Sequence, residues 1–144
     1  FSEAIGRYDR VLAFGIDTPE ATRLKLLAQV GRALCLAETG KPQEGITILE
    51  EIIANNDSQN AELFGRSYNA LGRCYLKGKR PKDALMAYLH VHLLFFSVPE
   101  VHAESLYYLG KLWPVVYKDK PERAAEARSL LREQYAGSVW AKRD

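Results

Sequence analysis

The chain has 144 residues, of which 47% are hydrophobic and 26% are charged, and this composition is typical of a folded domain. Its formal net charge of +2 is too small to indicate nucleic-acid binding by itself. No stretch of about 18 apolar residues predicts a membrane-spanning helix. The two cysteines, Cys35 and Cys74, form no Cys-x-x-Cys pair, so we expect buried packing thiols rather than metal ligands.

The first predicted element is a helix within residues 1–15. Ala4, Tyr8 and Val11 follow the i, i+4, i+7 spacing that places apolar side chains on one face of a helix. The chain begins with Phe1 rather than Met, and this helix has no partner before it. We therefore expect a fragment of a longer protein, or a partner that covers the exposed face.

Residues 18–57 predict two helices joined by a short turn, which we call repeat one. Thr18 and Pro19 are residue types that favour the cap and the first turn of a helix, and "SVPEVHAE" predicts a similar start around Pro99. The stretch "ANNDSQNAE" predicts a loop after the second helix. The same order returns in repeat two (60–97) and repeat three (99–136), followed by a tail (137–144). No sustained alternation predicts a strand.

Two sequence markers keep one period through the chain. The second helix of each pair begins at a proline, and these prolines are Pro42, Pro81 and Pro121. The first helix of each pair contains an apolar residue followed by glycine, and these glycines are Gly31, Gly72 and Gly110. A repeat of about 40 residues made of two helices predicts pairs that stack, because one pair is too small to bury its own apolar face.

The basic stretch "KGKRPK" (77–82) falls in the turn between the two helices of repeat two. We interpret it as a solvated turn rather than a phosphate site, since the ordered glycines of a phosphate-binding loop are missing.

The repeat pattern resembles the tetratricopeptide repeat family. The best match is repeat two, which has Tyr68, Leu71, Gly72, Tyr75, Ala84 and Tyr88 at the motif positions. In repeat three Arg128 replaces the motif's aromatic residue, which we interpret as the adaptation of a last helix to solvent. The resemblance implies an all-α fold, a right-handed α-solenoid of stacked antiparallel helix pairs. Its period is longer than the family's usual length of about 34 residues.

The closing stretch "EARSLLREQYAGSVWA" resembles closing segments of bacterial envelope proteins of this family. Neither the cytoplasm nor a bacterial periplasm is favoured by the sequence. Within the stretch, Trp140 is expected either to close the end of the core or to dock onto a neighbour.

The family resemblance also implies a non-enzymatic scaffold that binds a peptide or protein in the concave groove lined by the first helices. The residue after each glycine is a cation: Arg32, Arg73 and Lys111. The full set of predicted binding residues is Lys25, Arg32, Arg66, Asn69, Arg73, Tyr107 and Lys111. Such a row of cations suits an acidic segment or a C-terminal carboxylate. The alternative interpretation is that these charges only solvate the helix surface.

Three other functional classes compete with a groove ligand. The main alternative is a structural spacer or oligomerisation segment, with an oligomer contact at Phe95 and Phe96 at the end of an apolar stretch. Nucleic-acid binding is weaker, although Tyr107 and Tyr108 are residues that stack on bases. No enzyme is predicted, because no nucleophile elbow, His-Glu-x-x-His motif or phosphate loop occurs. No cofactor is predicted either.

The three histidines are better explained by packing than by a metal. His90 and His92 are two residues apart, so they face different directions on a helix. A metal site that combines either of them with His102 is the weaker alternative.

Overall fold

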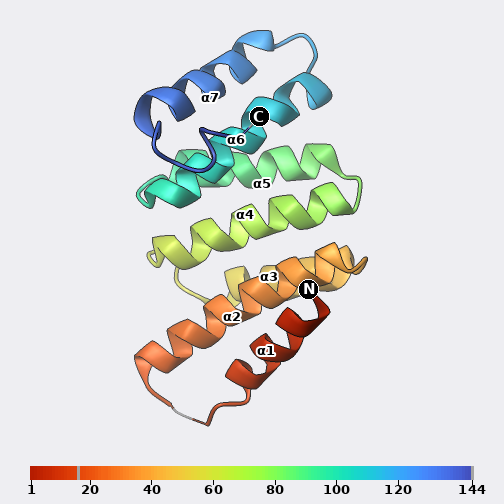
Figure 1. Ribbon diagram of the computed structural model, residues 1–144, viewed down its shortest axis with the longest axis vertical. Helices are drawn as coiled ribbons and strands as arrows, with labels where there is room; N and C mark the ends of the chain where they lie inside the picture. The colour runs from red at the N-terminus through yellow and green to blue at the C-terminus, as the bar shows by residue number, and fades with distance from the viewer. Residues whose placement is uncertain (16, 144) are drawn as a thin grey trace.

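The computed structural model describes residues 1–15 and 17–143, and in this part of the chain the fold is all-α, without a strand. The all-α prediction is confirmed. The helices are α1 (Ser2–Leu12), α2 (Pro19–Glu38), α3 (Pro42–Asn55), α4 (Ala61–Lys77), α5 (Pro81–Leu94), α6 (Pro99–Val116) and α7 (Pro121–Gln134). They are stacked along the long axis of the molecule, from α1 at one end to α7 at the other (Figure 1), and each helix packs against the next one in sequence. None of the helices described is long and apolar enough to span a bilayer.

Five helices begin at the prolines that the sequence marks, because proline in the first turn loses no intrahelical hydrogen bond. The Thr18 hydroxyl caps α2 by accepting from the Ala21 N–H at 3.1 Å, as predicted. Helix α6 begins at Pro99 as predicted, but the expected capping side chain is wrong, because the residue before Pro99 is Val98 and makes no side-chain cap.

The turns that join α2 to α3 and α4 to α5 have the same backbone hydrogen bonding. Lys41 N–H donates to the Leu36 carbonyl and Arg80 N–H donates to the Tyr75 carbonyl, both at 2.8 Å. These two pairs are 39 residues apart, so the structural register between α2 and α4 is 39. The second turn carries the basic stretch "KGKRPK", and its residues 77–80 are exposed, as expected for a solvated turn.

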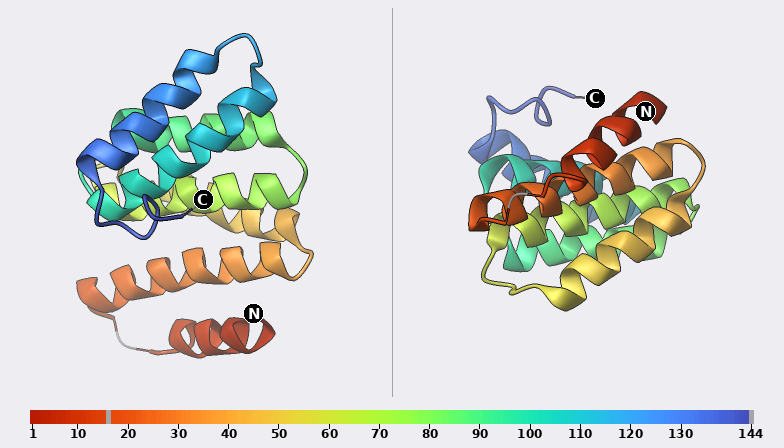
Figure 2. Two further views of the ribbon diagram at one scale, coloured as in Figure 1. Left: turned by 45° about the horizontal axis from the view of Figure 1, so that its top comes forward. Right: turned by 90° about the horizontal axis from the view of Figure 1, so that it is seen from below.

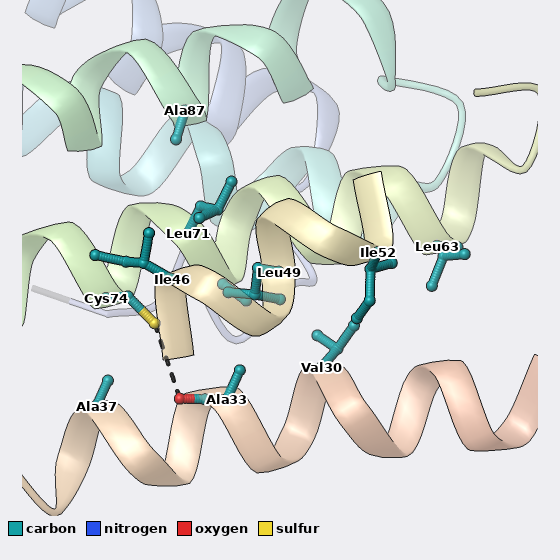
Figure 3. Packing of buried hydrophobic residues seen from close by; sticks show 11 residues of the cluster. Val30, Ala33, Ala37, Ile46, Leu49, Ile52, Leu63, Leu71, Cys74 and Ala87 are labelled. Atoms are coloured by element: carbon teal, nitrogen blue, oxygen red, sulfur yellow. Dashed lines mark hydrogen bonds between the residues drawn. The ribbon is translucent and has the colours of Figure 1, made fainter. Parts of the chain in front are cut away.

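The core consists of two clusters. The first joins α2, α3 and α4 around Leu49 and Leu71 (Figure 3), and the second joins α5, α6 and α7 around Tyr88 and Leu106. Both cysteines are free and buried, which confirms their predicted role. Figure 3 shows the Cys74 thiol directed at the Ala33 carbonyl, with Sγ and O 3.8 Å apart.

Glycine allows close helix contact in repeats two and three. A Cβ added at Gly72 would lie 2.5 Å from the Tyr88 ring, and one added at Gly110 would lie 3.0 Å from Arg128 Cγ. The aliphatic stem of Arg128 therefore packs where repeat two has an aromatic ring.

Repeat one has a different contact from the one that the sequence alignment predicts. A Cβ at Gly45 of α3 would lie 2.7 Å from the Ala33 carbonyl, whereas Gly31 faces the ring of Tyr8 on α1. Ala33 is 39 residues before Gly72, so Ala33 is the structural counterpart of Gly72. The alignment of Gly31 with Gly72 is wrong by two residues.

Candidate interaction groove

A cavity of about 400 Å³ lies between the first helices of the three repeats. We call it the groove, and it is lined by Leu27, Val30, Gly31 and Leu34 of α2, by Glu62, Arg66, Asn69, Ala70 and Arg73 of α4, and by Glu104 of α6. Each of the four α2 residues is 39 residues before an α4 residue of the same lining. The groove therefore presents the same faces of successive helices, in the register that the turns define.

The predicted binding residues on α4 lie together. Arg66, Asn69 and Arg73 all line the groove. Tyr107 and Lys111 are each 38 residues further along the chain than Asn69 and Arg73, at the corresponding positions of α6. They line a separate cavity against α7.

The predicted binding residues on α2 do not line the groove. Arg32 lies two residues from the groove position of α2, which is Leu34, and it lines a cavity with residues of α1 and α3. Its Nε donates to Asp9 Oδ1 at 2.8 Å. Lys25 is half-buried and is also absent from the groove lining. The cations Arg32, Arg73 and Lys111 thus line three different cavities.

Leu27 and Leu34 are groove residues that the sequence reasoning missed. Both are half-buried, and they give the α2 side of the groove an apolar surface opposite the charged side chains of α4. Counting backwards from Pro42 and Pro81, which follow the two equivalent turns, would have identified them.

The cations of α4 have acidic partners beside the groove. Arg73 Nη2 lies 2.9 Å from Glu38 Oε1, and Lys77 Nζ lies 2.9 Å from Glu38 Oε2. Hydrogen bonds from Lys77 and Arg73 lower the pKa of Glu38 despite its partial burial. Arg66 Nε lies 3.2 Å from Glu62 Oε1.

Glu62 also accepts from Arg23 Nη2 at 3.1 Å, which links α2 to α4. Burial raises the pKa of Glu62, but the hydrogen bonds and charges of Arg66 and Arg23 outweigh it and leave that pKa lowered. The arginines of α4 are therefore held in place by ion pairs, and each one remains part of the groove wall.

Two polar groups of the groove are not fully compensated. Burial raises the pKa of Glu104, although the charges of Arg73 and Arg66 and a hydrogen bond from Asn69 oppose the shift. Asn69 is 2% exposed, and its Nδ2 donates to the Val101 carbonyl at 2.9 Å. Its Oδ1 is buried and has no partner in the part of the chain that the structure describes. A ligand N–H that reached Oδ1 would satisfy it.

The histidines are hydrogen-bonded within the helix packing. His90 Nδ1 lies 2.8 Å from the Met86 carbonyl. His92 Nδ1 lies 2.8 Å from His102 Nε2, and His102 Nδ1 lies 2.6 Å from the Tyr135 hydroxyl. Burial and the neighbouring His92 lower the pKa of His102 to about 4. Among residues 1–15 and 17–143, no three side chains of metal-binding type form a group.

The two phenylalanines predicted as an oligomer contact have different environments. Phe95 is buried and packs on Phe64 and Tyr68, with ring centroids 5.7 and 5.8 Å apart, so it belongs to the chain's own core. Phe96 is 58% exposed beside the exposed Leu93 and Leu94. Trp140 packs against Tyr107 and Tyr108 of α6, which supports its predicted role in closing the end of the core.

Comparisons of the chain with protein-family models, with curated proteins and with solved structures found no match.

Proposed function

We propose that this chain is a tetratricopeptide-type interaction scaffold, a right-handed α-solenoid whose groove binds a protein segment without catalysing a reaction. The observation that carries the proposal is the groove itself, where half-buried leucines of α2 face Arg66 and Arg73 of α4 at matched positions of successive helices. The repeated turn geometry and the stacked helix pairs support the repeat assignment.

The groove residues indicate which side chains a bound segment should carry, and they do so in more detail than a row of cations would. Leu27 and Leu34 suit one large apolar side chain, and Arg73 suits a carboxylate beside it. The lining contains two arginines and two glutamates, Glu62 and Glu104. We therefore expect a segment with one or two carboxylates next to an apolar anchor, and a long acidic run should be repelled by the glutamates.

The proposal is tested by probing an array of immobilised peptides with the purified protein and with two groove variants, Arg73→Ala and Leu34→Ser. We expect peptides that pair an acidic residue with a large apolar one to be retained by the unchanged protein. Each groove variant should lose about 10-fold or more in affinity for them, because one good charged contact or one apolar anchor contributes more than about 1.4 kcal/mol.

Arg32→Ala and Leu24→Ser are matched controls, because they remove the same side-chain types from α2 outside the groove. Leu24 is 58% exposed, and Arg32 lines another cavity. Circular dichroism of all variants establishes that each is folded. If the control variants lose the same peptides as the groove variants, or if no peptide binds, the groove is not a binding site.

A structural segment is the second candidate, and one observation favours it. Leu93, Leu94 and Phe96 are 63%, 64% and 58% exposed at the corner between α5 and α6, and such a patch is typical of an interface. Sedimentation velocity of the protein and of a Leu94→Ser, Phe96→Ser variant tests it. Self-association that this variant abolishes would support the structural role, and a monomer at every concentration would exclude this contact.

A further inference from the structure

The segment after α7 folds back onto α6 and forms one wall of a second cavity. In Figure 1 its trace crosses in front of α6. Trp140 lies on Tyr107 and Tyr108, with ring centroids 5.4 and 5.7 Å apart. Ser138 holds the segment in place, since its hydroxyl donates to Glu100 Oε2 and accepts from the Trp140 N–H, both at 3.2 Å. The wall is thus fixed at two points by contacts with α6.

This cavity, which we call the basic pocket, has a volume of about 390 Å³. It is lined by Tyr107, Gly110 and Lys111 of α6, by Arg128, Leu131 and Arg132 of α7, and by Trp140, Ala141 and Arg143 of the closing segment. Four of these residues are cations, and no carboxylate belongs to the part of the lining that lies within residues 1–15 and 17–143. The groove, by contrast, balances Arg66 and Arg73 with two glutamates.

Three further cavities, of about 390, 410 and 280 Å³, each have an acidic residue and an arginine in their lining. Asp9 accompanies Arg32 in the first, Asp17 lines the second, and Glu126 lines the third. The concentration of positive charge in the basic pocket is therefore a property of this place and does not reflect the chain as a whole, whose net charge is only +2.

Ion pairing is sparse around the three arginines of the basic pocket, although the charge of Arg143 acts on the Glu104 carboxylate of the groove. Arg128, Arg132 and Arg143 form no ion pair among the residues that the structure describes. Arg128 Nε donates to the Ala124 carbonyl at 3.2 Å, which leaves the terminal nitrogens of its guanidinium for other partners. The Arg143 guanidinium lies over the rings of Trp140 and Tyr107, 5.0 and 5.6 Å from their centroids.

Stacking on aromatic rings orients the Arg143 guanidinium and leaves its N–H edge available as a donor. Like charges gathered around one cavity repel each other, and a bound anion removes that repulsion. A phosphomonoester carries about −1.5 to −2 charges at pH 7 and three acceptor oxygens, so it matches several arginines better than a single carboxylate does.

We propose that the basic pocket binds a phosphomonoester group, carried either by a phosphorylated peptide side chain or by a small phosphate ester. The apolar and aromatic wall of Leu131, Ala141 and Trp140 provides contact for the carbon skeleton that bears the phosphate. The basic pocket and the groove share no lining residue, so the two sites can be tested with separate variants.

Trp140 is a reporter within the proposed site. The chain has two tryptophans, so a Trp113→Phe background makes the fluorescence specific to Trp140. We expect O-phosphoserine, added at constant ionic strength, to produce a saturable change with a dissociation constant in the submillimolar range. Arg132→Gln and Arg128→Met should each weaken binding 10-fold or more, and methionine keeps the stem that packs on Gly110.

Arg123→Gln is the matched control on α7, because Arg123 pairs with Glu126 at 3.7 Å and lines a different cavity. It should bind O-phosphoserine like the unchanged protein. Thermal melts show whether each variant is folded, and Arg132→Lys, which keeps the charge, should retain most of the affinity. Equal effects of O-phosphoserine and chloride, or equal losses in Arg123→Gln and Arg132→Gln, would overturn the proposal.

The source of the phosphate is resolved with a phosphoserine peptide, the same peptide with serine, the same peptide with glutamate, and inorganic phosphate. Tighter binding of the phosphopeptide than of O-phosphoserine identifies a peptide ligand, and equal binding identifies a small ester. If the glutamate peptide binds as tightly as the phosphopeptide, the pocket recognises carboxylates and the phosphomonoester assignment is wrong.

Discussion

A tyrosine packs against a glycine at two places in the chain, Tyr8 on Gly31 near the N-terminus and Tyr88 on Gly72 in the middle. The two tyrosines have different environments. Tyr88 of α5 lies against Gly72 and stacks on Tyr108 at 4.7 Å, and it is fully buried. Tyr8 of α1 lies against Gly31 and is only half-buried. Helix α1 has no buried residue at all.

The difference shows that the burial of these two tyrosines depends on how many helices flank them. Helix α5 packs between α4 and α6, while α1 contacts α2 alone. Figure 2 shows α1 at the edge of the stack and α5 inside it. The same tyrosine–glycine contact is therefore expected to contribute less to the stability of the fold in α1 than in α5, as nearest-neighbour stacking predicts.

The largest expected effect is that of Tyr88→Ala, which removes a fully buried ring. We expect the free energy of unfolding in urea to fall by about 4 kcal/mol. Tyr8→Ala should cost about 1 kcal/mol, because its ring is half in solvent. Similar losses for the two variants would show that α1 packs as firmly as α5, and the comparison between end and middle would fail.

Alanine substitutions at Gly72 and Gly31 should have smaller effects on stability that still differ between the two sites. Gly72→Ala should destabilise by about 2 kcal/mol, because the new Cβ meets a ring that has no room to move. Gly31→Ala should be near neutral, since the exposed end of Tyr8 can shift and alanine favours helix by about 1 kcal/mol. Thermal and urea unfolding of both variants would measure this, and a large loss for Gly31→Ala would contradict it.

Acid should selectively destabilise the half of the chain that contains the histidines. The pKa of His102 is about 4 when folded and 6.5 ordinarily, so the unfolded chain binds more protons between these values. The contribution of neutral His102 to the free energy of unfolding is therefore fully present above pH 6.5 and is lost as the pH falls towards 4. At pH 5 the loss should be about 2 kcal/mol.

Hydrogen exchange at pH 7 and pH 5, corrected for intrinsic rates, would locate that loss. Protection of α5, α6 and α7 should fall, while α2 and α3, which contain no histidine, should change less. His102→Gln serves as the control because it has no titrating ring, and its stability should vary less with pH. An unchanged pH dependence in this variant would assign the effect to other groups.

The smallest expected effect concerns the hydroxyl of Tyr88. It is buried and has no hydrogen-bond partner among the described residues, so Tyr88→Phe removes an uncompensated polar group. We expect the free energy of unfolding to stay equal or to rise by less than about 1 kcal/mol. A loss of more than that would reveal a partner for this hydroxyl. Tyr8→Phe, at a half-exposed ring, provides the reference.

The sequence was sufficient for the helices and their order because prolines and capping residues act locally. Pro42, Pro81 and Pro121 begin α3, α5 and α7 where the pattern predicts them. The glycine marker gives the wrong register for α2, although the 39-residue spacing of Pro42 and Pro81 equals the register that the turns show. Helix α2 is longer than α4, and its glycine lies two residues from the position that contacts the second helix.

Two residues correspond to a rotation of about 200° around a helix axis. The glycine alignment therefore selected residues on a different face of α2 from the face that lines the groove. Accordingly, the structure brings Arg66, Asn69 and Arg73 of α4 together in the groove lining, while Lys25 and Arg32 of α2 lie outside that lining.

The basic pocket was missed because it forms only where the closing segment folds back on α6. The sequence analysis expected Trp140 either to close the core or to dock onto a neighbour, and it did not place this side chain against Tyr107 and Tyr108.

The two thiols are 39 residues apart, so they occupy the same position in adjacent repeats. Cys74 is fully buried, and burial raises its pKa to about 11, while Cys35 is 7% exposed with a pKa raised for the same reason. A thiol that is protonated and shielded reacts only when its surroundings open. The labelling rates of Cys35 and Cys74 by an alkylating reagent would therefore measure how often the surroundings of each thiol open, and Cys74 would report the separation of α4 from α2 and α3.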